Sequence, residues 1–135
     1  VQPGYRNSNL GEKIIAAAIM RFEPTPKPLI EQRMRETLRQ KNAVQPVSER
    51  SAGCVFKNPD PELSGGRGAG QLVDDCGLKG RSMGDAMVSP LHGNFIVNRG
   101  SALATDVLAL IDQVREEVAQ QTGIQLELEV KRWLG

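Results

Sequence analysis

The sequence predicts an α+β fold, in which a small mixed sheet packs against helices. Two segments carry apolar residues at helical spacing, over residues 29–41 and 105–122. A third segment, residues 124–130, alternates strictly between apolar and polar residues, as a strand with one buried face does. Helices and strands follow one another without a regular βαβα rhythm, which favours α+β over a parallel doubly wound sheet.

The first segments of the chain predict a strand, a linker and a helix. Residues 14–22 are rich in β-branched and aromatic residues and predict a mostly buried strand, although the alanines at 16–18 also suit a helix. Three prolines, at 24, 26 and 28, then indicate a stiff linker. Over residues 29–41, Ile30, Met34 and Leu38 recur every fourth position, which predicts an amphipathic helix with one narrow buried stripe.

The middle of the chain predicts short elements. Residues 52–56 form an apolar run that must end before Asn58-Pro59-Asp60-Pro61, so they are expected at the end of a strand. Residues 68–76 predict a short helix, with Gly77 in a left-handed conformation at its end. Two strand-like segments follow, over residues 80–88 and 94–98.

The last part of the chain predicts a long helix followed by a strand. Ser101 or Thr105 can cap the helix, Gly123 ends it, and four residues form its buried stripe, namely Val107, Ile111, Val114 and Val118. The strand over residues 124–130 turns its apolar residues to one face and Gln125, Glu127 and Glu129 to the other.

Composition excludes several classes of function. A chain of 135 residues is the size of one domain, and its net charge of +1 implies no basic surface for nucleic acid. Its longest apolar run is far shorter than the roughly 20 residues of a membrane-spanning helix. Two cysteines without CxxC spacing and one histidine predict neither a metal cluster nor a disulfide framework. We therefore expect no nucleic acid, membrane or metal partner, and a reducing compartment, the cytoplasm.

Spacing alone leaves the chemistry open. The glycine-rich residues 65–70 lack an upstream strand and a following Gly-Lys-Ser/Thr, so a surface loop is favoured over a phosphate site. His92 has no partner set by spacing, and Cys54 can be a small buried hydrophobe. Glu127 and Glu129 share one face of the last strand, and spacing cannot choose between them.

Five segments, in order, resemble the C-terminal half of the UDP-N-acetylenolpyruvoylglucosamine reductase family. The stretch Ser51-Ala52-Gly53-Cys54-Val55-Phe56-Lys57-Asn58-Pro59 is similar to the family motif AGSxFKNP, and Gly4-Tyr5-Arg6-Asn7-Ser8 is similar to its GYRxS element. The others are Ala69-Gly70-Gln71-Leu72 with Gly77-Leu78-Lys79-Gly80, then residues 88–98 from Val88-Ser89-Pro90 to Val97-Asn98, and Leu126-Glu127-Leu128-Glu129-Val130-Lys131.

The resemblance implies a flavoenzyme that reduces UDP-N-acetylglucosamine enolpyruvate to UDP-N-acetylmuramate for peptidoglycan. In the family, the serine of AGSxFKNP protonates the substrate, assisted by an arginine and a glutamate. Carried over, the catalytic residues are Cys54, Arg6 and Glu129, and the substrate-binding residues are Tyr5, Lys57, Asn58 and His92. Cys54 stands in place of the family serine, and a thiol with a pKa near 8.5 remains a competent proton donor at neutral pH.

The resemblance also implies which parts and cofactors the complete enzyme needs. Residues 1–23 match the end of the FAD-binding domain, and residues 24–135 match the substrate-binding domain. FAD and NADPH are expected in the complete enzyme and neither on this chain alone, because the glycine-rich flavin-binding part precedes the GYRxS element in the family. Its partners would be the UDP-sugar and the missing flavin domain. The alternative is a non-catalytic substrate-binding or interaction module without its own flavin domain.

Overall fold

The structure is a computed structural model that describes residues 1–4, 7–11 and 13–132. It divides into two compact units, residues 1–33 and residues 34–135. The first unit contains a two-stranded antiparallel pair, β1 (Pro3–Gly4) and β2 (Asn7–Ser8). Helix α1 (Lys27–Val44) begins in the first unit and ends in the second.

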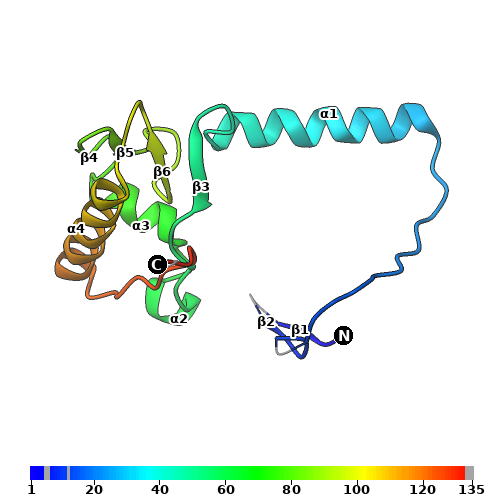
Figure 1. The fold of residues 1–135 in the computed structure, drawn as a ribbon, viewed down its shortest axis with the longest axis horizontal. Coiled ribbons are helices and arrows are strands. Elements are labelled where there is room, and N and C mark those ends of the chain that lie inside the picture. Colours follow the sequence, from blue (N-terminus) through cyan, green and yellow to red (C-terminus); the bar gives the residue numbers. More distant parts are fainter. Residues whose placement is uncertain (5–6, 12, 133–135) are drawn as a thin grey trace. The chain divides into compact units, whose positions relative to one another are not determined.

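The second unit is built on a four-stranded antiparallel sheet in the order β3-β6-β5-β4 (Figure 1). The strands are β3 (Arg50–Cys54), β4 (Ser82–Met83), β5 (Ala86–Val88) and β6 (Phe95–Asn98). Helix α2 (Pro61–Ser64) and helix α3 (Ala69–Asp75) follow β3 along the chain. Helix α4 (Ala104–Thr122) packs against β4, β5 and α3. The predicted α+β class is therefore confirmed.

The core lies among the sheet, α3 and α4. Its fully buried side chains include Leu72 and Val73 of α3, Leu110 and Ile111 of α4, and Leu126. The predicted stripe of α4 is confirmed, because Ile111, Val114 and Val118 are buried and Val107 packs partly against them. Burying side chains of this size contributes roughly 1.5–3 kcal/mol each, which is what holds the helices onto the short strands.

Several predicted elements are present with adjusted ends. Helix α3 matches the helix predicted over residues 68–76, and Gly77 has the expected positive φ of 69°. The predicted strand over 80–88 is two strands, β4 and β5, separated by a turn at Gly84 and Asp85. Helix α4 ends before Gly123 as predicted, but neither Ser101 nor Thr105 caps its start. Instead the Asp106 carboxylate accepts a hydrogen bond from the Leu103 N–H at 2.9 Å.

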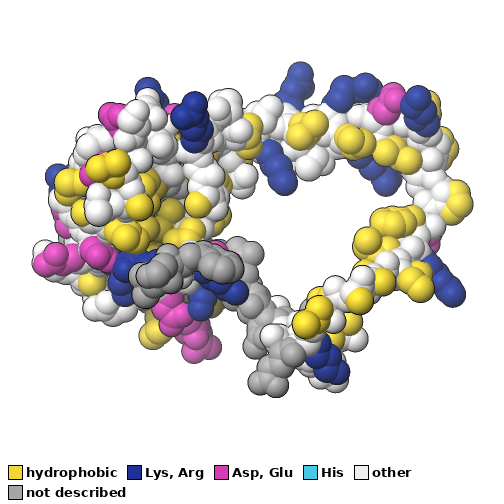
Figure 2. All heavy atoms as spheres, viewed as in Figure 1, with side chains coloured by type: hydrophobic (Ala, Val, Ile, Leu, Met, Phe, Trp, Pro, Cys, Tyr) yellow, Lys and Arg dark blue, Asp and Glu magenta, His cyan; other side chains and the backbone are white. Residues whose placement is uncertain are grey.

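The buried strand predicted over residues 14–22 is wrong. These residues have no regular secondary structure, and their large apolar side chains are exposed, as Figure 2 shows for the segment between β2 and α1. A strand forms only when another strand completes its hydrogen bonds, and no strand in the described part of the chain pairs with this one. Apolar composition indicated burial without identifying a partner.

Helix α1 is confirmed and is longer than predicted, but the predicted burial of its apolar stripe is wrong. Ile30, Met34 and Leu38 are 43%, 58% and 56% exposed, and no residue of α1 is buried. Spacing every fourth residue defines a face on a helix, whereas burial of that face depends on what packs against it.

Candidate active site

The candidate site is built around the end of β3, where the pairing with β6 is interrupted. Ser51 pairs with Val97 and Cys54 pairs with Phe95, so the register shifts by one residue between them. Gly53 lies within this interruption with φ of +89°. A Cβ on Gly53 would meet no atom within 4 Å, so the backbone conformation, rather than lack of space, favours glycine here.

This β-bulge directly precedes Cys54, the last residue of β3. A bulge bends its strand and reorients the side chains that follow, and bulges are common beside active sites. Cys54 is a partly buried thiol at the point where the strand leaves the regular ladder. The sequence signal for this bulge is a lone glycine within a strand-like run.

Gly53→Ala is expected to destabilise the protein by about 1–3 kcal/mol, because it forces an L-residue into the positive-φ region. It should also slow turnover by displacing Cys54. Gly123→Ala is the matched control, since Gly123 has φ of +74°, also meets nothing within 4 Å, and lies at the end of α4. Denaturant unfolding and turnover of the full-length protein check both variants. A Gly53→Ala protein that loses stability without losing turnover would contradict the placement of Cys54 by this bulge.

The C-terminal segment pairs with the chain that follows Cys54. Phe56 and Leu128 form an isolated antiparallel bridge, flanked by hydrogen bonds from the Lys57 N–H to the Glu127 C=O and from the Glu129 N–H to the Val55 C=O, both 2.8 Å. The predicted strand over 124–130 is reduced to this bridge, because its partner reaches Pro59 two residues after Lys57. Its predicted inward face is confirmed, with Leu126 buried and Ile124, Leu128 and Val130 partly buried against the core.

The structure distinguishes the two glutamates that spacing could not separate. Glu129 is partly buried and lies opposite Val55, the residue after Cys54. Glu127 lies opposite Lys57, and its side chain is 76% exposed. The Glu127 carboxylate forms an ion pair with the Lys57 ammonium at 3.1 Å. Glu129 therefore lies opposite the residue that follows Cys54, and Glu127 lies beside Lys57.

Asn58 caps helix α3, a contact that spacing in the sequence does not indicate. Its Oδ1 accepts a hydrogen bond from the Ala69 N–H at 3.0 Å, at the first residue of α3. The residue before the helix, Gly68, has no side chain to cap it, so Asn58 supplies the cap from ten residues upstream. A Cβ on Gly68 would lie 3.0 Å from the same oxygen, which explains why the cap position is a glycine.

Substitution of Asn58 can separate this cap from a role in substrate binding. Asn58→Ala is expected to lower stability by about 1 kcal/mol, as loss of a helix cap does. Asn58→Asp keeps the accepting oxygen, so stability should stay within about 0.5 kcal/mol of the parent. Asn58→Asp nevertheless removes the amide donor and adds a negative charge, so the KM for an anionic substrate should rise about tenfold, which corresponds to about 1.4 kcal/mol. An unchanged KM in Asn58→Asp would restrict Asn58 to the capping role.

His92 lies against the same turn of α3. A Cβ on Gly70 would lie 2.7 Å from His92 Cε1, and the His92 ring packs edge-on against Phe95 with a centroid distance of 4.9 Å. Its Nδ1 accepts a hydrogen bond from the Asn94 N–H at 3.1 Å, which leaves Nε2 as the protonated nitrogen of the neutral ring. Burial and then the positive charge of Lys79 lower the pKa of His92 below its ordinary 6.5. At neutral pH, His92 is therefore an uncharged donor through Nε2.

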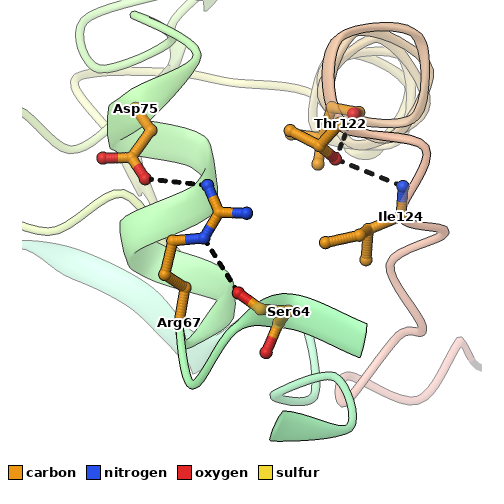
Figure 3. Close-up of polar contacts among 6 residues, drawn as sticks. Ser64, Arg67, Asp75, Thr122 and Ile124 are labelled. Atoms are coloured by element: carbon orange, nitrogen blue, oxygen red, sulfur yellow. Dashed lines mark hydrogen bonds and ion pairs between the residues drawn. The ribbon is translucent and has the colours of Figure 1, made fainter. Parts of the chain in front are cut away.

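The glycine-rich residues 65–70 connect α2 to α3 and do not form a dinucleotide site. Gly65 ends α2 in a left-handed conformation, and Arg67 Nε donates to the Ser64 C=O at 2.9 Å while its Nη1 pairs with Asp75 at 3.4 Å (Figure 3). A flavin pyrophosphate fingerprint needs a strand directly before the glycines, whereas α2 precedes these. Residues 65–70 therefore do not have the fingerprint that binds a flavin pyrophosphate at the end of a strand.

Two of the predicted site residues lie outside the described residues. They are Tyr5 and Arg6, which belong to the first unit of the chain. The structure brings the other five onto two neighbouring features of the second unit. Cys54, Lys57 and Glu129 lie where β3 continues beside the C-terminal segment, and Asn58 and His92 lie against the first turn of α3.

An apolar cavity of about 540 Å³ contains none of these residues. Side chains of β3, β6, α4 and residues 130–132 line it. Size alone therefore does not identify this cavity as the reaction site, because none of the predicted site residues lines it. Among the described residues, no cluster of three or more His, Cys, Asp or Glu side chains is arranged to hold a metal ion. No helix in the described part of the chain is long and apolar enough to cross a membrane.

Comparison with known proteins identifies the family. Residues 45–133 match the model of the UDP-N-acetylenolpyruvoylglucosamine reductase C-terminal domain. UDP-N-acetylenolpyruvoylglucosamine reductase 2 of Symbiobacterium thermophilum is 44% identical over 131 residues, which cover 96% of this chain and 41% of the relative. The reductase of Agathobacter rectalis is 45% identical over 129 residues, which cover 94% of this chain and 40% of the relative.

A solved structure agrees with these relatives. The crystal structure of UDP-N-acetylenolpyruvylglucosamine reductase from Thermus caldophilus superposes with a TM-score of 0.67 at 48% identity, over 83% of this chain and 37% of that one. The chain spans about two-fifths of the length of the curated relatives it matches. Because the family model covers more than half of the chain, the chain belongs to the UDP-N-acetylenolpyruvoylglucosamine reductase family, in the region of its C-terminal domain.

Proposed function

We propose that this chain is the part of a UDP-N-acetylenolpyruvoylglucosamine reductase that holds the UDP-sugar and protonates its enolpyruvyl group. The observation that carries the proposal is the bulge at Gly53, which ends β3 at Cys54 and leaves Glu129 beside the next residue. A thiol at the end of a strand is a suitable proton donor, and a partly buried carboxylate on the neighbouring segment is a suitable group to assist it. The family membership supplies the substrate class.

Each predicted site residue has a role in this proposal. Cys54 gives its thiol proton to one carbon of the enolpyruvyl double bond, becomes a thiolate, and later regains a proton from water. Glu129 orients the enolpyruvyl group or relays that proton. Arg6 binds the substrate carboxylate through its planar guanidinium and stabilises the charge that develops on it. Tyr5 packs beside the substrate.

The remaining three residues bind the UDP-sugar. Lys57 offers an ammonium at the exposed rim, where its ion pair with Glu127 exchanges for an anionic group of the substrate. His92 donates through Nε2 without adding a charge, in keeping with its lowered pKa. Asn58 donates through its amide while its oxygen caps α3.

We further propose that residues 1–23 are the end of the flavin-binding domain and residues 24–135 are the substrate-binding domain. The prolines at 24 and 26, just before α1, and at 28, in its first turn, support this boundary because they stiffen the chain there. In the complete enzyme, bound FAD that NADPH has reduced would supply a hydride to the other carbon of the double bond. The cytoplasm, where NADPH and nucleotide sugars are available, is the proposed location.

Turnover by the full-length protein tests this function. We expect oxidation of NADPH that depends on UDP-N-acetylglucosamine enolpyruvate, with UDP-N-acetylmuramate detected by mass spectrometry. The control omits the enolpyruvyl substrate or replaces it with UDP-N-acetylglucosamine, which lacks the enolpyruvyl double bond. Binding of the UDP-sugar without product would instead support a non-catalytic binding module. If the protein neither binds the UDP-sugar nor forms the product, both functions are rejected.

A further inference from the structure

The side chain of Asn94 clamps the chain between the proposed proton donor and the substrate lysine. Asn94 is 4% exposed, in the loop just before β6. Its Oδ1 accepts a hydrogen bond from the Phe56 N–H, and its Nδ2 donates to the Phe56 C=O, both at 2.8 Å. The Asn94 C=O also accepts a hydrogen bond from the Val55 N–H at 2.9 Å. The two residues after Cys54 are therefore held by one asparagine.

The Asn94 side-chain amide takes the place of a backbone hydrogen-bonding partner for Phe56. With Cys54 opposite Phe95, the antiparallel register places Val55 opposite Asn94 and would place Phe56 opposite Gly93. The backbone at Gly93 instead packs onto α3, since a Cβ there would lie 2.5 Å from the Gly70 C=O. The Asn94 amide, which carries one donor and one acceptor as a peptide group does, completes the ladder in its place.

We propose that Asn94 is a positioning residue that sets the direction of Cys54 and Lys57 by holding Phe56 between them. This inference rests on the proposed function, because that function gives Cys54 and Lys57 their roles. Asn94 itself is assigned no contact with the substrate. The side chain at position 94 is buried, so it must offer both an acceptor for the Phe56 N–H and a donor for the Phe56 C=O. An ionised carboxylate offers only acceptors, and one of its oxygens would face the Phe56 C=O.

Asn94→Asp in the full-length protein tests the clamp through its pH dependence. At high pH, the introduced carboxylate repels the Phe56 C=O, and we expect kcat to fall about 10²-fold, the loss that a displacement of about 1 Å can cause. Burial raises the pKa of a carboxyl group, so the protonated form returns as the pH is lowered and can donate to the Phe56 C=O. The ratio of the variant kcat to the parent kcat should therefore rise as the pH falls. A ratio that does not change with pH would overturn the proposal.

Asn98→Ala, at the far end of β6 from Asn94, is the matched control. Asn98 ends β6, and its Oδ1 also accepts backbone hydrogen bonds, from the Gly100 N–H at 2.9 Å and the Ala102 N–H at 3.1 Å. Its pairing partner is Arg50, at the opposite end of β3 from Cys54. Asn98→Ala should lower stability yet leave kcat within about threefold of the parent, whereas Asn94→Ala should lower kcat even at a temperature where both variants are fully folded. Equal kcat values for the two variants would overturn the proposal.

A double substitution shows whether Asn94 acts through Cys54. Residues that act as a unit are not additive, so Asn94→Asp should cost little further kcat in a Cys54→Ala protein. Additive losses would overturn the clamp while leaving the proposed function intact. A full-length parent without turnover, or a Cys54→Ala protein with parental turnover, would instead refute the proposed function, and the inference with it.

Discussion

Cys54→Ala is expected to slow substrate reduction by the full-length protein by about 10²–10⁴-fold, the usual contribution of a general acid. Cys54→Ser should keep most of the turnover, because a hydroxyl occupies the same place at the end of β3 and also carries a proton. The measurement is the rate at which the enolpyruvyl substrate is reduced in a single turnover. Reduction of the flavin by NADPH in the absence of substrate should be the same in all three proteins.

Cys76→Ala is the matched control for Cys54→Ala. Cys76 is also a partly buried thiol, and burial followed by the charge of Asp75 raises its pKa. It lies at the end of α3 and packs against the core, so its loss should affect stability and leave turnover unchanged. Parental turnover in Cys54→Ala, or an equal loss in Cys76→Ala, would reject Cys54 as the proton donor.

Glu129→Gln is expected to slow the same chemical step by about 10²-fold while binding the UDP-sugar nearly as well as the parent. The substitution keeps the shape and removes the charge of the partly buried side chain opposite Val55. Substrate affinity and single-turnover rate, measured separately, check this division. A large loss of affinity with an unchanged rate would assign Glu129 to substrate binding instead.

Glu127→Gln is the matched control for Glu129→Gln, two residues away on the same segment. It breaks an exposed ion pair with Lys57, which contributes at most about 1 kcal/mol, so stability and kcat should stay near the parent values. Affinity for an anionic substrate should change by no more than a few fold, and the change should diminish at high salt because exposed charges are screened. If Glu127→Gln proves the more damaging substitution, the assignment of the two glutamates is reversed.

The sequence correctly predicted the elements whose regularly spaced apolar residues are buried against the core of the second unit. Helix α4 and the inward face of residues 124–130 followed from spacing, because both bury their apolar residues against the same core. The strand over residues 14–22 failed for the opposite reason. Its apolar composition predicted burial in a sheet, which needs a neighbouring strand. No described strand pairs with these residues, and the relatives are more than twice as long as this chain.

The candidate site was predicted from motif resemblance rather than from pattern. Spacing could not show that Asn58 caps α3 or that Asn94 reaches Phe56 across 38 residues of chain, because both contacts depend on how β3, α3 and the loop before β6 meet. It also could not separate Glu127 from Glu129, which differ in burial and not in periodicity. Roles for Tyr5 and Arg6 rest on the motif alone, since both lie outside the described residues.

The bulge at Gly53 has a consequence for position 54, where this chain has cysteine and the motif it resembles has serine. The backbone path at the end of β3 is determined by the residue before Cys54 and by the hydrogen bonds of the residues after it. Ser and Cys side chains differ by one atom, so we expect them to exchange at position 54 without rearrangement of this backbone. If Cys54 is the proton donor that we propose, this scaffold accepts donors of different acidity at one position without a change in the path of its backbone.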